Sequence, residues 1–260
     1  MDTYKTDRNS FNEPSLLDTL ELGAVDPILS LLMKFRTCTD PDKINLTAGT
    51  YRDEELKNYV FHSVRKAEEE LLTDSSLTRD YMPQLGDEQF NQESRKLFFE
   101  NEHELVKKHR VVSVQSASGS GALRFAFEII RKTKGKGKTV YLPDPTFINH
   151  PLLSEHLGFK TLSYEYFDPQ TLGIKFESLL KALDEAEEES IFVMHTCAFN
   201  PCSSDLSDDQ WKTVAAIAKK KKHFFVMDTA YPGFASGKIK EDVKPLEILA
   251  NEGIELAICQ

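Results

Sequence analysis

The sequence has 260 residues, of which 40% are apolar and 28% charged, and 32 Lys and Arg against 42 Asp and Glu give a net charge of −10. This acidic balance excludes general nucleic-acid binding and anionic-membrane binding, because both need a basic surface. Since no apolar run approaches the roughly 18–20 residues of a spanning helix and the N-terminus has no apolar leader, the sequence predicts a soluble, cytoplasmic protein.

The front of the chain predicts an arm, three helices and a short strand. Asp26 followed by Pro27 is typical of a helix start, because Asp caps the free N–H groups and Pro fits the first turn. The expected ranges are an arm over 1–25, helices from Asp26, over 57–72 and from Asp87 to about Glu100, and a strand running from Lys43 into a loop at Gly49.

From residue 110 onward, apolar strand-like runs alternate with helical spacing. This alternation predicts βαβ units, and therefore an α/β fold with a mostly parallel sheet and helices on both faces. Strands are expected over 111–116, 138–143, 160–167, 190–197, 223–228 and 254–259, and helices over 122–132, 149–157, 176–189, 207–222 and 244–253. Ligands of such sheets bind beyond the carboxyl ends of the strands, so the residues after each strand are the candidates for a site.

The turn after the first of these strands is rich in Gly and Ser. Small residues at a helix start leave backbone N–H groups open to an anion, so Ser118, Gly119 and Ser120 could cradle a phosphate. A dinucleotide fingerprint is disfavoured because Arg124 occupies the third glycine position. Taken alone, the turn is equally compatible with a plain connection between strand and helix.

Three further strand ends carry residues that suit a flat ligand. Asp228 follows a buried apolar run, where a carboxylate needs a partner such as a ligand cation, and Tyr231 is close enough to donate to a ligand oxygen. Asn200 could bind a ring oxygen and Phe147 could stack on a ring. Each residue could instead have a purely structural role. Asp228 could cap the segment that follows it, Asn200 could belong to an Asn-Pro turn, and Phe147 could pack in the core.

Together, these strand ends favour a phosphorylated, planar cofactor with a basic ring nitrogen, which pyridoxal phosphate fits. A zinc site at His195, Cys197 and Cys202 is disfavoured, because the grouping is single and begins inside an apolar strand.

In its motifs the sequence resembles the class I aspartate aminotransferases, which are fold-type I pyridoxal-phosphate enzymes. The resemblance runs nearly end to end, and the order and spacing of its motifs make it specific. The motifs are DPIL (26–29), NLTAGTYRDEE (45–55), RDYMPQLG (79–86), QSASGSGALR (115–124), VYLPDPTFINH (140–150), HTCAFNPCSSDLSDDQW (195–211) and MDTAYPGFASG (227–237).

The resemblance implies a role for each matching position. It places Asp228 against the pyridine nitrogen with His150 supporting Asp228, and Asn200 and Tyr231 on the ring's phenolic oxygen. It also implies that Ser118, Gly119 and Ser120 hold the phosphate, that Phe147 stacks on the ring, that Gly49 lies near the substrate carboxylate and that Tyr81 reaches the cofactor of a partner subunit in a homodimer.

Several positions depart from the family pattern. Phe147 stands where Trp is usual, Phe199 where His is usual, Pro232 where Gln is usual, and Asn-Pro-Cys-Ser (200–203) replaces Asn-Pro-Thr-Gly. The family's Ser-x-x-Lys, whose lysine forms the Schiff base, would follow directly after Gln260. We therefore expect no catalytic residue of that kind within the chain, and no activity from this chain alone.

The resemblance gives two functional hypotheses. The first is pyridoxal-phosphate-dependent transamination between aspartate and 2-oxoglutarate, with the lysine supplied by a longer product or by a second chain. The second is a non-catalytic scaffold or interaction subunit that keeps the fold. For either, we expect an N-terminal arm and small-domain segment over 1–56 and an incomplete large cofactor-binding domain over 57–260.

Overall fold

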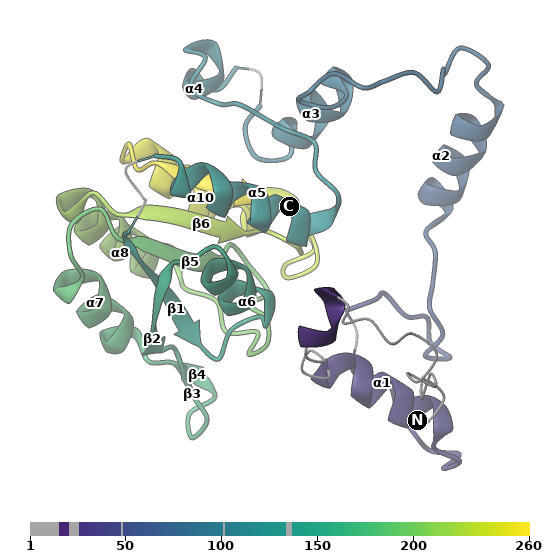
Figure 1. Ribbon diagram of the computed structural model, residues 1–260, viewed down its shortest axis with the longest axis horizontal. Helices are drawn as coiled ribbons and strands as arrows, with labels where there is room; N and C mark the ends of the chain where they lie inside the picture. The colour runs from purple at the N-terminus through teal and green to yellow at the C-terminus, as the bar shows by residue number, and fades with distance from the viewer. Residues whose placement is uncertain (1–15, 21–25, 48, 101, 134–136) are drawn as a thin grey trace. The chain divides into compact units, whose positions relative to one another are not determined.

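The computed structural model describes residues 16–20, 26–47, 49–100, 102–133 and 137–260 of the chain. The chain divides into two compact units, Met1–Asp80 and Tyr81–Gln260, and the elements of both are shown in Figure 1. The domain boundary expected after residue 56 stays a prediction. No helix among the described residues has the length and apolar character needed to span a membrane.

The described residues of the first unit form short helices and one isolated β-bridge. Its helices are η2 (Leu16–Thr19), α1 (Pro27–Thr37) and α2 (His62–Thr73). The start of α1 is as predicted, because the Asp26 carboxylate accepts the N–H groups of Ile28 and Leu29 at 2.8 and 2.9 Å. Of the arm expected over 1–25, residues 1–15 and 21–25 lie outside the described residues.

Two predictions for the first unit are wrong. The described residues of the strand expected from Lys43 are irregular, because they find no ladder partner; the isolated bridge here joins Arg52 to Asn58. Helix α2 begins at His62 instead of residue 57, since the residues before it pack as an aromatic cluster. Ring centroids of Tyr51 and Phe61 lie 4.7 Å apart, and the Tyr59 N–H donates to the Tyr51 carbonyl at 3.0 Å.

The second unit begins with three helices, α3 (Glu88–Lys96), α4 (Glu104–Lys107) and α5 (Ser118–Arg131). Asp87 caps α3 as expected, accepting the Phe90 N–H at 2.7 Å, although the helix ends before residue 100. The strand predicted over 111–116 is wrong. Val112 is 78% exposed, and the Gln115 N–H donates to the carbonyl of Leu85, which belongs to no strand.

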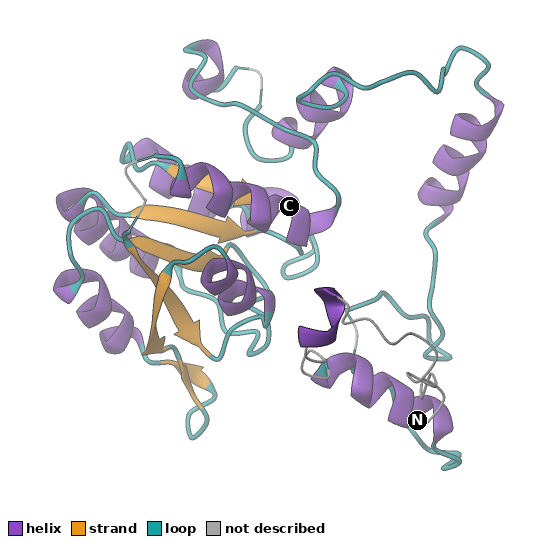
Figure 2. Ribbon diagram, in the orientation of Figure 1, coloured by secondary structure: helices purple, strands orange, loops and turns teal. Residues whose placement is uncertain are grey.

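A five-stranded parallel sheet forms the centre of this unit, as the alternating pattern predicted (Figure 2). Its order is β2-β1-β5-β6-β7. The strands are β1 (Thr139–Asp144), β2 (Lys160–Glu165), β5 (Ile191–His195), β6 (Phe224–Asp228) and β7 (Leu256–Cys259). A separate antiparallel pair, β3 (Phe167–Asp168) and β4 (Gly173–Ile174), follows β2.

Helices cover both faces of the sheet. They are α5 and α6 (Asn149–His156), together with α7 (Phe176–Glu185), α8 (Asp208–Lys221), the short α9 (Ile239–Asp242) and α10 (Lys244–Asn251). Because successive side chains of a strand point to opposite faces, Phe192 and Met194 of β5 join the core with α7, α8 and α10, whereas Ile191 and Val193 join the core with α5.

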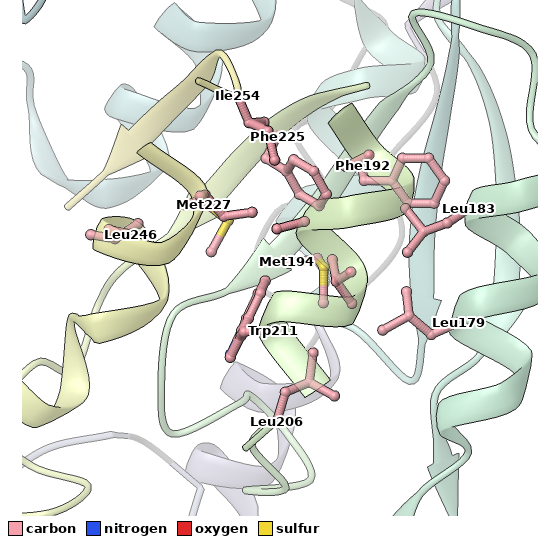
Figure 3. Packing of buried hydrophobic residues seen from close by; sticks show 14 of the residues in the cluster. Leu179, Leu183, Phe192, Met194, Leu206, Trp211, Phe225, Met227, Leu246 and Ile254 are labelled. Carbon is pink, nitrogen blue, oxygen red and sulfur yellow. The ribbon is translucent and has the colours of Figure 1, made fainter. Parts of the chain in front are cut away.

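The larger core packs aromatic and sulfur side chains between the sheet and α8. Figure 3 shows Trp211 of α8 among Met194, Phe225 and Met227 of the central strands, and all four are at most 2% exposed. Helix α8 is fixed at its start by a capping box, in which Ser207 and Gln210 bond each other's backbone N–H groups. This packing holds the ends of β5 and β6 in place.

The strand order creates a switch point beside β1. The chain runs from β1 to β2 on one side and then crosses to β5 on the other side of β1. In open parallel sheets, a crevice forms at the carboxyl ends of strands where the order reverses in this way. The residues that follow β1, β5 and β6 are therefore brought to one edge.

Removing a core ring tests this packing. We expect Phe225→Ala to lower the free energy of unfolding by about 3–5 kcal/mol, because Phe225 is fully buried and its loss leaves a cavity. Phe234→Ala, in which the ring removed is 62% exposed, should lower it by less than about 1 kcal/mol. Urea denaturation of both variants measures the difference, and equal losses would contradict the assigned core.

Candidate functional site

A cavity of about 210 Å³ lies at the carboxyl edge of the sheet. Seven of the ten residues predicted from the sequence line it, and they come from segments far apart in the chain. They are Ser118, Gly119, Ser120, Phe147, Asn200, Asp228 and Tyr231. Leu123, His195, Cys197 and Ala230 complete the lining.

The first turn of α5 forms one wall of the cavity. Ser118 is the first residue of the helix, so the predicted Gly/Ser turn is itself helical. Ala117 at the cap position has no side-chain acceptor, which leaves the N–H groups of this turn open. With the positive end of the helix dipole, these donors suit an anion.

The hydroxyl of Ser120 is oriented by a neighbouring amide. The Asn149 side chain donates from Nδ2 to Oγ of Ser120 at 2.8 Å. Because this bond uses a lone pair of the oxygen and not its proton, the Ser120 hydroxyl keeps its proton to donate elsewhere. Ser120 can therefore add a side-chain donor to the backbone donors of the turn.

Asp228, the last residue of β6, also lines the cavity. Its carboxylate is 11% exposed, and Oδ2 lies 3.0 Å from Nε2 of the fully buried His150. Since a carboxylate can only accept, Nε2 donates to it, and on the far side of the ring Nδ1 lies within hydrogen-bond distance of the Thr146 hydroxyl, at 2.6 Å. This Thr146–His150–Asp228 chain fixes the carboxylate against the cavity.

His195 also lines the cavity, beside the Asp228 carboxylate, a position not predicted from the sequence. Both of its ring nitrogens are buried without a hydrogen-bond partner, and Nε2 lies 3.8 Å from Oδ2 of Asp228. Burial lowers the pKa of His195 to about 4, so the ring is neutral at neutral pH. A signal was present in the sequence, namely a polar residue at the last position of an otherwise apolar strand.

The side chains that could bind a metal ion in the cavity are not the His195, Cys197 and Cys202 grouping of the sequence. Donor atoms of His150, His195 and Asp228 lie within 4.8 Å of one another. The 3.0 Å contact between His150 and Asp228 is already a hydrogen bond, so the cluster is that of a carboxylate held by an imidazole. Cys197 lines the cavity, and burial, together with Asp242 and Asp205, raises the pKa of its thiol to about 12.

The remaining predicted residues are placed as follows. The ring of Phe147 meets that of His150 edge to face, with centroids 5.7 Å apart. Tyr81, the first residue of the second unit, is 99% exposed and does not line the cavity. Gly49 belongs to the first unit, in irregular exposed chain. The roles of Tyr81 and Gly49 stay predictions.

Comparison with known proteins assigns the chain to a family. Residues 41–260 match the profile described as Aminotransferase class I and II. The chain belongs to this family. The family resemblance and the α/β fold class predicted from the sequence are therefore confirmed.

The relatives are aminotransferases of greater length. The mitochondrial aspartate aminotransferase of Dictyostelium discoideum is 38% identical over 241 residues, which are 93% of this chain and 56% of the relative. The structure of the aspartate aminotransferase from Saccharomyces cerevisiae cytoplasm has a TM-score of 0.89 and 32% identity, covering 94% of this chain and 60% of that one.

A second similar structure is that of an enzyme with a bound cofactor. It is an aromatic-amino-acid aminotransferase from Burkholderia pseudomallei covalently bound to pyridoxal phosphate, with a TM-score of 0.88 and 33% identity over 94% of this chain and 60% of that one. This chain thus spans 56–60% of the length of these three proteins.

The buried His195 should make stability depend on pH. An unfolded His binds its proton near pH 6.5, whereas folded His195 does so only near pH 4. Between these values the unfolded state holds more protons, so stability falls as pH falls. We expect His195 to account for a loss of about 2 kcal/mol between pH 7 and pH 5.

Urea denaturation at the two pH values measures this loss. His195→Gln should remove it, and His156→Gln, which changes an exposed His, should retain it. A pH dependence that is the same in both variants would contradict the assignment to His195.

Proposed function

We propose that this chain forms the pyridoxal-phosphate cradle of an aspartate aminotransferase-type enzyme, which transfers an amino group between aspartate and 2-oxoglutarate. The observation that carries the proposal is one cavity with an anion-binding helix start on one wall and a buried carboxylate on another. Membership of the aminotransferase family and the bound cofactor named for a relative support it.

The helix start of α5 fits the phosphate of this cofactor. Its open N–H groups have no cap of their own, and Ser118 and Ser120 add hydroxyl groups at the same place. Ser118 takes a backbone angle φ of 67°, which is uncommon outside glycine and costs conformational energy. A non-glycine residue held in this form at a cavity wall is typical of a ligand site.

Asp228 fits the ring nitrogen. A buried carboxylate is costly without a compensating charge or hydrogen bonds, and in this chain it has one imidazole at 3.0 Å. A protonated ring nitrogen facing the cavity would supply the balancing charge. His150, held by Thr146 on its far side, would keep the carboxylate aimed at that nitrogen.

The other cavity residues fit the rest of the ring. Asn200 and Tyr231 can donate hydrogen bonds to its phenolic oxygen, and Phe147 presents an aromatic ring for stacking. When bound, pyridoxal phosphate supplies a protonated pyridine ring that accepts electrons from the substrate carbanion. The contribution of this chain is to hold that ring's nitrogen protonated, its oxygen bonded and its phosphate anchored.

The proposal extends to groups that the chain does not itself contribute. Transamination needs the Schiff-base lysine and the arginines that bind the substrate carboxylates, and the family resemblance places these after Gln260. They belong to a longer product or to a second chain. Within that assembly, Gly49 would approach the substrate carboxylate.

We also propose a homodimer and a cytoplasmic location. The nearly complete exposure of Tyr81 suits a side chain that reaches the cofactor of a partner subunit. The location is supported by the relative from Saccharomyces cerevisiae cytoplasm, whereas the Dictyostelium discoideum relative is mitochondrial.

Cofactor binding tests the cradle without any need for turnover. Asp228→Asn should weaken binding of added pyridoxal phosphate at least about tenfold, because a charge-assisted hydrogen bond contributes about 1.5–3 kcal/mol and 1.4 kcal/mol is a factor of ten. Asp168→Asn removes a carboxylate at the end of β3, outside the cavity lining, and should leave the affinity for pyridoxal phosphate unchanged. Titration by absorbance measures both, and equal affinities would contradict the assigned role of Asp228.

Turnover separates the enzyme from the scaffold hypothesis. The chain loaded with pyridoxal phosphate should give no measurable oxaloacetate from aspartate and 2-oxoglutarate, whereas a product that continues through a Ser-x-x-Lys should turn over. A coupled assay measures oxaloacetate in both. A reading frame that continues past Gln260 without such a lysine would end the enzyme hypothesis and leave the scaffold.

A further inference from the structure

The two loops that carry Asn200 and Tyr231 contribute to the lining of two cavities. Besides the first cavity, both residues line a second one of about 260 Å³, together with Phe199 and Phe234. Both side chains are half-buried, and the parts that line the cavities are not packed against protein atoms. Their direction therefore depends on the backbone that carries them.

A carboxylate holds the backbone just before Asn200. Asp205 accepts the N–H of Ala198 at 2.7 Å through Oδ2 and the N–H of Phe199 at 3.0 Å through Oδ1. Both carboxylate oxygens are therefore used on consecutive residues. Ala198 has φ of 46°, a left-handed backbone conformation that is unfavourable for alanine. The two charge-assisted hydrogen bonds stabilise this conformation.

A second carboxylate holds the backbone just after Tyr231. Asp242 is 6% exposed and accepts three N–H groups, from Gly233 at 2.7 Å, Ala235 at 3.2 Å and Ser236 at 3.0 Å. Gly233 has φ of 90°, and a side-chain carbon there would come within 3.1 Å of Ile239. The turn after Tyr231 is thus wrapped around one buried carboxylate.

We propose that Asp205 and Asp242 are positioning residues that set, through the backbone, the directions from which Asn200 and Tyr231 reach the ring oxygen of the cofactor. This inference rests on the proposed function. Neither carboxylate lines the first cavity, so each acts through the loop that it holds. The phosphate wall of the cavity is positioned separately, by α5 and Asn149.

Asp→Asn substitutions test the inference with little change of shape. Each replaces a carboxylate oxygen with an NH₂ group that faces a backbone N–H, so at least one bond is lost and two donors are opposed. Asp168→Asn is the matched control. Asp168, at the end of β3, likewise accepts a backbone N–H, from Gln170 at 3.0 Å, and it accepts the hydroxyl of Thr171 at 2.9 Å.

Hydrogen–deuterium exchange measures how well the backbone amides of the two loops are protected in the absence of the cofactor. Asp205→Asn should speed exchange at Ala198 and Phe199 at least about tenfold, and Asp242→Asn should do the same at Gly233, Ala235 and Ser236. Amides in the middle of β5 and β6 should be unchanged in both variants. Exchange that is unchanged in the loops, or raised throughout the sheet, would overturn the positioning role.

Binding measurements then separate the two ends of the cavity. Asp205→Asn and Asp242→Asn should each lower the affinity for pyridoxal phosphate about fivefold or more. Each should also shift the absorbance maximum of the bound cofactor, because that maximum depends on whether the ring oxygen carries a proton. Affinity for inorganic phosphate should stay within twofold of the unsubstituted protein. The Asp168→Asn control should match the unsubstituted protein with both ligands.

The outcomes distinguish this inference from the proposed function. If the unsubstituted protein does not bind pyridoxal phosphate, the proposed function fails and the ring-oxygen role fails with it. If the unsubstituted protein binds the cofactor and the two variants bind it equally well with the same spectrum, the inference alone is overturned. Equal weakening of phosphate and cofactor would indicate general loss of structure and would also overturn it.

Discussion

The hydrogen bond between His150 and Asp228 is the interaction on which the candidate site depends. It joins the beginning of α6 to the end of β6, with the imidazole completely buried and the carboxylate nearly so. A charge in such a place is tolerated only where donors surround it, and Thr146 extends the arrangement by fixing the far nitrogen of the ring. The site is therefore built around one nearly buried carboxylate that lines the cavity.

The parallel sheet explains why the remaining groups meet this carboxylate. His195 and Asp228 are register partners at the ends of β5 and β6, and Cys259 at the end of β7 is the next partner. A common direction for all strands brings the loops that follow them to one edge. The start of α5 approaches the same edge, because a side-chain carbon at Gly119 would lie 3.7 Å from the carbonyl carbon of Gln260.

Phe199, which departs from the family pattern, is packed between aromatic neighbours. It occupies the position where the aspartate aminotransferases usually carry His, and its ring stacks on Tyr166 at 4.1 Å and 15°. It also meets His195 edge-on at 4.4 Å, so it offers that imidazole an apolar surface. Burial lowers the pKa of His195 to about 4, and it is His150 that bonds directly to Asp228, at 3.0 Å.

The sequence by itself determined the parallel α/β architecture and most of the cavity lining. Alternating strand and helix patterns fix strand direction, and strand direction fixes which residues share an edge, so Asp228, Asn200 and the Ser118 turn could be found without coordinates. Only the tertiary structure decided the rest. Residues 111–116 have a strand-like composition, yet a strand exists only where a ladder partner is present. His195, Asp205 and Asp242 gain their importance from contacts with residues of other segments or from backbone N–H groups, and neither kind of contact leaves a pattern in the order of the amino acids.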